Sequence, residues 1–213
     1  MLLRDHGRTY AHEAGIRIER NTPAALFQLL YLALLLSAPI HAADATRAAK
    51  ALIDAGLTTP RKMAEATWQA RVDVLTTHGY KRYDERTSTM LGETAQLVLD
   101  RYAGDLRRLR DAADHDPARE HQLLQEFKGV GPVGADIFLR EVQVVWDEVH
   151  PFADARVLAA ARQLGLGSDA RALSRLVARD ELARLTSALI RVELAHAYEQ
   201  VRDAAIGGPR STV

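Results

Sequence analysis

The sequence predicts an all-α protein of about ten helices in two closely packed lobes. No stretch alternates between apolar and polar residues with the period of two that a half-buried strand requires. Ala, Leu, Arg and Glu, which favour helices, dominate instead. Apolar residues recur at steps of three and four, as in Leu182, Leu185, Leu189 and Val192. This spacing places them on one face of a helix.

The first long element is an uncharged apolar run at 24–40. A membrane-spanning helix needs about 20 apolar residues, and this run is shorter and contains Gln28. A signal peptide would carry its apolar run near the N-terminus after a basic stretch, whereas acidic residues such as Asp5 precede this one. We therefore predict a buried core helix that Thr22 caps and Pro23 opens.

Proline, glycine and polar clusters divide the rest of the chain into further helices. No long linker separates them, so we expect one module over residues 1–213. Within it, 23–144 form one helical lobe, and 1–22 with 145–213 form the second. The further predicted helices are 43–55, 59–66, 68–76, 85–102, 107–113, 119–127, 133–145, 154–164 and 180–205.

The composition excludes several classes of site. The chain has no cysteine, which excludes disulfides, a thiol nucleophile and a cysteine-ligated iron–sulfur cluster. The eight histidines show no pair four residues apart with an acidic third ligand, so we expect no metal site and no cofactor. The 28 basic residues equal the 28 acidic ones, so binding to nucleic acid would require a local patch. We expect a cytoplasmic protein without a membrane segment.

The most informative segment is a glycine-containing turn, Lys128-Gly129-Val130-Gly131-Pro132-Val133-Gly134, between two predicted helices. Glycine tolerates positive φ and lets another chain approach closely. The second helix begins directly after the turn, and its free N–H groups and positive dipole end suit a phosphate. The alternative is a turn that only connects two helices. The candidate DNA-binding residues are Lys128, Gly129, Val130, Gly131, Val133 and Gly134.

This segment resembles the helix-hairpin-helix of the HhH-GPD (endonuclease III-like) base-excision DNA glycosylases, with the motif at 119–145. The likeness continues at Leu35-Leu36-Ser37-Ala38, at Gly79-Tyr80 and at 151–157, in the order found in the family. It covers roughly residues 21–166. The resemblance implies that family's fold and duplex DNA containing a damaged base as partner. We expect a monomer, associated with the nucleoid if the source is bacterial.

Two departures from the family pattern define the implied chemistry. Members that cleave the backbone through a Schiff base carry a lysine where Val133 stands, and valine forms no imine. The resemblance therefore implies a monofunctional enzyme that hydrolyses the N-glycosidic bond, with no lyase activity and no iron–sulfur cluster. Pro39 replaces the glutamine that often fills the gap left by the flipped base, and Ile40 or His41 could substitute. The resemblance also implies a candidate monovalent-cation site on the hairpin carbonyls.

Asp154 matches the essential carboxylate of the family. Breaking an N-glycosidic bond builds positive charge on the sugar, and a fixed carboxylate stabilises that charge and orients water. The simpler alternative is that Asp154 only caps the helix that follows it. Both roles can coexist.

The remaining candidates are aromatic and basic. Tyr80, Tyr83 and Phe152 could stack on a flipped base, although aromatic residues at helical spacing are more often core. Lys81, Arg82, Arg86 and the arginines from 107 to 110 could contact phosphates or form a solvated helix face. The alternative function is a catalytically inactive helix-hairpin-helix protein that recognises DNA structure.

Overall fold

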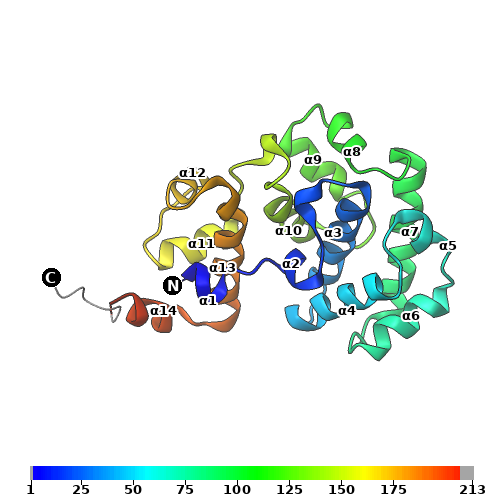
Figure 1. The fold of residues 1–213 in the computed structure, drawn as a ribbon, viewed down its shortest axis with the longest axis horizontal. Coiled ribbons are helices and arrows are strands. Elements are labelled where there is room, and N and C mark those ends of the chain that lie inside the picture. Colours follow the sequence, from blue (N-terminus) through cyan, green and yellow to red (C-terminus); the bar gives the residue numbers. More distant parts are fainter. Residues whose placement is uncertain (1, 207–213) are drawn as a thin grey trace. The chain divides into compact units, whose positions relative to one another are not determined.

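The computed structural model describes residues 2–206, and every regular element in that range is a helix (Figure 1). The predicted all-α class is confirmed. The described residues form fourteen α-helices and three 3-10 helices rather than about ten helices. Three of the additional helices, α1 (Leu2–His6), α2 (Tyr10–Ala14) and α12 (Ala170–Ser174), have five residues each and are too short to show a 3.6-residue period.

The described chain divides into two compact units, one formed by residues 10–149 and the other by the described parts of 1–9 and 150–213. Residues 10–22 and 145–149 therefore belong to the larger unit, whereas we expected both segments in the second lobe. The reason is a buried contact, because the backbone N–H groups of Tyr10 and Ala11 donate to the Glu141 carboxylate at 2.8 and 3.2 Å.

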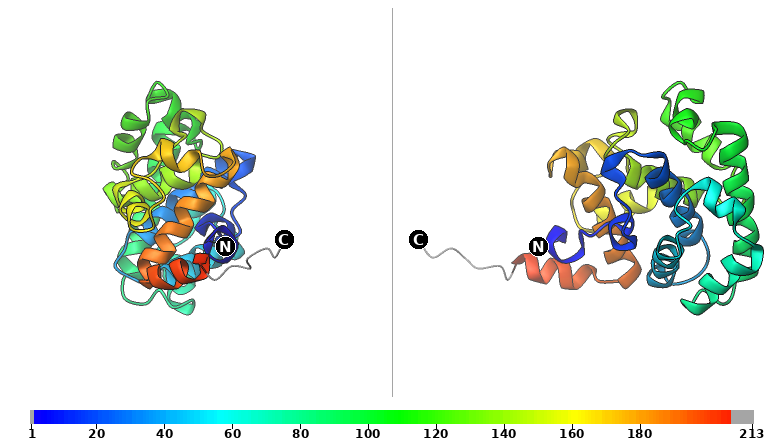
Figure 2. Two further views of the ribbon diagram at one scale, coloured as in Figure 1. Left: turned by 90° about the vertical axis from the view of Figure 1, so that its left-hand side faces the viewer. Right: turned by 45° about the vertical axis from the view of Figure 1, so that its right-hand side comes forward.

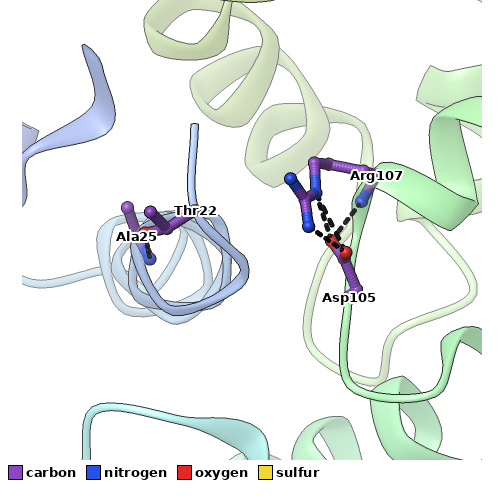
Figure 3. Close-up of polar contacts among 4 residues, drawn as sticks. All are labelled: Thr22, Ala25, Asp105 and Arg107. Atoms are coloured by element: carbon purple, nitrogen blue, oxygen red, sulfur yellow. Dashed lines mark hydrogen bonds and ion pairs between the residues drawn. The ribbon is translucent and has the colours of Figure 1, made fainter. Parts of the chain in front are cut away.

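The core of the larger unit is built on α3 (Pro23–Leu36). The Thr22 hydroxyl accepts the Ala25 N–H at 3.2 Å and caps the helix (Figure 3). Every residue from 25 to 35 is buried except Gln28, whose amide donates to a backbone carbonyl. The predicted core helix is confirmed, and none of the described helices is both long and apolar enough to cross a membrane. Around α3 pack α4 (Ala42–Asp54), α7 (Asp84–Tyr102) and α10 (Pro132–Val142).

Helices α5 (Pro60–Glu65) and α6 (Trp68–Thr77) pack on α7 (Figure 1). A buried arginine of α6 joins the three helices. The Arg71 guanidinium donates to the carbonyls of Met63 and Ala66 at 3.0 and 2.6 Å and to the Ser88 carbonyl at 3.0 Å. Carbonyls at a helix end lack partners within the helix. Arg71 supplies donors to the end of α5 and holds it on α7, which positions the first turns of α7.

The smaller unit is organised around α13 (Leu182–Ala195), whose predicted apolar stripe is buried. The prediction of one continuous helix over 180–205 is wrong. His196 adopts left-handed geometry with φ 52°, and the Ala197 N–H bonds back to the Val192 carbonyl at 3.0 Å. This C-cap ends α13, and α14 (Tyr198–Ile206) begins in a new direction (Figure 2). Also packed on α13 are α1, α11 (Ala155–Gln163) and α12.

Candidate nucleic-acid interface

The predicted helix-hairpin-helix is present in the larger unit. Helix α9 (Pro117–Leu124) and helix α10 are joined by the turn at 125–131. Phe127 and Val130 are almost completely buried, and the Val130 N–H donates to the Phe127 carbonyl at 2.9 Å. These two apolar side chains fix the turn to the core, so its other residues face outward.

Gly129 is seated on the two helices beside the hairpin. Its φ is +90°, which L side chains rarely adopt, and a Cβ there would lie 2.6 Å from the Met90 sulfur. Its carbonyl accepts the Ser37 hydroxyl at 3.1 Å. Ser37 ends α3 and Met90 lies on α7. The turn therefore requires glycine at this position.

The start of α10 is exposed. Gly131 is extended, with φ −86° and ψ −169°, and a Cβ on it would meet no atom within 4 Å. Pro132 opens the helix, and Val133 is 58% exposed. The first N–H groups of a helix have no carbonyl partner within it, and they carry the positive end of the dipole. This surface can bind an anion such as a phosphate.

Two cations of the turn region, Lys128 and Arg101, are paired with carboxylates. The Lys128 ammonium lies 2.9 Å from the Glu93 carboxylate, and Arg101 pairs with Glu126. Arg107 donates to Asp105 from its backbone N–H and its guanidinium, at distances down to 2.6 Å (Figure 3). Within the turn, the backbone N–H groups at the start of α10 are therefore the candidate donors for an anion.

A cavity of about 400 Å³ lies beside the turn. The residues after α3, the first turns of α7 and the hairpin meet there, which brings the predicted Pro39, Tyr80 and Tyr83 together with Gly129. Ile40 and His41 follow Pro39 in the chain but do not line the cavity. The lining residues are Leu34, Ser37, Ala38, Pro39, Tyr80, Tyr83, Arg86, Thr87, Met90 and Gly129.

The cavity combines apolar walls with one guanidinium. Tyr80 is 2% exposed, its hydroxyl lies 3.4 Å from the Thr87 hydroxyl, and burial raises the pKa of the Tyr80 phenol. Arg86 is exposed at the rim. Thr87 and Met90 also line the cavity, and neither was predicted from the sequence. Their spacing from Tyr83 in steps of three and four along α7 was the available signal.

Asp154 is the N-cap of α11 in the smaller unit. Its Oδ1 accepts the N–H groups of Arg156 and Val157 at 3.0 and 3.1 Å, and the residue is 8% exposed. The predicted capping role is confirmed. Phe152 is half-buried in the same unit. Asp154 and Phe152 thus belong to one unit, while the hairpin and the cavity belong to the other.

No protein-family model matches the sequence, and no curated protein matches it. Among solved structures, the chain is similar to endonuclease III in a trapped covalent intermediate with DNA, an estranged-adenine complex. The two share 19% identity over 76% of this chain and 71% of that chain, with a TM-score of 0.49.

Proposed function

We propose that this protein is a monofunctional DNA glycosylase that hydrolyses the N-glycosidic bond of a damaged or modified base in duplex DNA. The observation that carries the proposal is the glycine turn, which is fixed on α3 and α7 while the N-terminus of α10 is exposed. Backbone N–H groups there would hold a phosphate without reading sequence.

The cavity beside the turn supports the same proposal. It shares Gly129 with the hairpin, so a phosphate held at α10 would place a neighbouring base close to the cavity. Its tyrosines and apolar walls suit an unstacked base, which costs a few kcal/mol to extrude from the duplex. The Arg86 guanidinium supplies donors to the acceptor edge of a base.

In this proposal Asp154 is the catalytic carboxylate. Its capping bonds fix the side chain at the start of α11. A fixed carboxylate can stabilise the positive charge that develops on the deoxyribose, and it can orient or deprotonate the attacking water. Water then replaces the base on the sugar carbon, which leaves an intact abasic site.

The test is a set of duplexes that each carry one damaged base. Because Val133 cannot form an imine, we expect abasic sites that break only after alkali is added, and no protein–DNA adduct after borohydride. A trapped adduct would contradict the monofunctional assignment. Duplex binding without excision of any lesion would instead support the inactive DNA-binding alternative.

The role of α10 can be tested by Gly131→Asp. Gly131 is exposed with open space around it, so aspartate fits the fold but places a negative charge at the proposed phosphate site. We expect duplex affinity to fall at least about tenfold, without sequence preference, and with a smaller dependence on salt.

The matched control is Gln200→Glu, which adds the same charge at an exposed position of α14. It should bind duplex almost as the parent does. A folded Gly131→Asp protein with parental affinity would remove the hairpin from the proposal.

A further inference from the structure

One acidic side chain of the hairpin is enclosed by protein. Glu120 lies on α9 and has no exposed surface, although glutamate is rarely buried without a partner. Neither of its carboxyl oxygens accepts a hydrogen bond from any donor among the described residues. An ionised carboxylate in such a position is strongly unfavourable.

A neighbouring polar group is another carboxyl. Glu148, on the 3-10 helix η2 (Asp147–Val149), lies close enough to Glu120 for the two carboxyls to share a hydrogen bond when one of them carries a proton. Arg110, on α8 (Arg107–Ala112), directs its Nε and Nη2 to the two oxygens of Glu148, the latter at 2.6 Å. The arginine is thus engaged with Glu148. A hydrogen bond between two carboxyls requires a proton on one of them, and because Arg110 engages Glu148, that proton belongs on the buried Glu120.

The pair has further titratable neighbours. The Nδ1 of His115 lies 3.5 Å from Glu148, and its Nε2 lies 3.6 Å from Asp111. On the side of α10, His121 and Asp136 pair with each other at 3.0 Å. The remaining acidic neighbours are Asp116, at the start of α9, and Asp147.

These surroundings give the two carboxyls opposite protonation states. Burial, followed by the hydrogen bond to Glu148 and the charge of Glu148, raises the pKa of Glu120 to about 8. Although burial opposes it, the hydrogen bond from Arg110 lowers the pKa of Glu148 to about 2. Near neutral pH, Glu120 is therefore a neutral donor and Glu148 a carboxylate.

We propose that Glu120 is a proton-dependent positioning residue of the hairpin. When protonated, it fastens α9 to η2 and, through Glu148, to α8. When ionised, it places a buried carboxylate beside the carboxylate of Glu148, whose arginine partner is already engaged, and α9 must move or admit water. Because α9 leads into the glycine turn, the hairpin loosens as the pH rises.

Trp146 reports on this movement without DNA. It is fully buried, its ring centroid lies 5.8 Å from the Arg110 guanidinium carbon, and it is one of two tryptophans in the chain. The substitution Trp68→Phe leaves Trp146 as the only tryptophan, so the tryptophan fluorescence then comes from Trp146 alone. Between about pH 6 and pH 9.5 we expect its emission to shift to the red, and Glu120→Gln in the same background to abolish the shift.

Two further variants test whether the change in Trp146 emission reports on Glu120 and not on another carboxyl. Glu126→Gln removes an exposed carboxylate from the same hairpin, and it should retain the transition. Glu148→Gln removes the like charge and frees Arg110, so the transition should move to lower pH. The proposal is overturned if the parent shows no transition, or if the Glu120→Gln protein keeps it.

The pH dependence of duplex affinity is a second test of the positioning role. This test rests on the proposed function, because it requires that the protein binds DNA. We expect the parent to lose about tenfold in affinity from pH 6.5 to pH 9, and Glu120→Gln to lose much less. A fluorescence transition in a protein that binds no duplex at any pH would refute the proposed function and leave the positioning role intact.

Discussion

Replacing Asp154 with Asn is expected to reduce base excision by about 10²–10³-fold while the protein stays folded and binds DNA. The Asn side-chain oxygen can still accept the N–H groups of Arg156 and Val157, so the cap of α11 is kept. The charge that would stabilise the developing oxocarbenium ion is lost. The free energy of unfolding should change by less than about 1 kcal/mol.

The measurement is single-turnover excision of a lesion that the parent cleaves, with urea unfolding and duplex binding on the same preparations. Asp169→Asn is the matched control, because the Oδ1 of Asp169 caps α12 by accepting the Ala172 N–H at 2.8 Å. That variant makes the same chemical change at another helix start and should retain full activity. Full activity in Asp154→Asn would leave Asp154 as a cap only.

Replacing Gly129 with Ala should destabilise the larger unit by about 1–2 kcal/mol. The main part is the strain of an L side chain at φ +90°. The contact of the new methyl group with the Met90 sulfur, 2.6 Å from the Cβ position, adds little because the end of this flexible side chain can rotate into the cavity. Since the strained turn leads into α10, duplex affinity should fall as well.

Gly131→Ala is the control, because its φ is −86° and its Cβ meets open space. Urea unfolding should show a change below about 0.5 kcal/mol for this variant. Adding Met90→Ala to Gly129→Ala removes the contact between the new methyl group and the Met90 sulfur, but it leaves the backbone strain at position 129. A double-mutant cycle therefore separates the two contributions to the free energy of unfolding. Equal stability of the two alanine variants would show that Gly129 is not seated as described.

The features that the sequence alone determined are local. The Thr22 cap, the buried stripe of α13, the glycine turn and the Asp154 cap each depend on residues within a few positions of one another. Helix periodicity and capping follow from backbone geometry over one or two turns, so the order of residues is enough to predict them. The break at His196 escaped prediction because its neighbours continue the helical pattern.

The tertiary structure alone decided which distant residues meet. Pro39, Tyr83 and Gly129 line one cavity because α3, α7 and the hairpin pack together, and no spacing in the sequence encodes that meeting. The burial of Glu120 against Glu148 is of the same kind, since a glutamate on a short polar helix gives no sign of being enclosed. Such contacts depend on how side chains from separate helices fill a shared interior, which the whole fold settles at once.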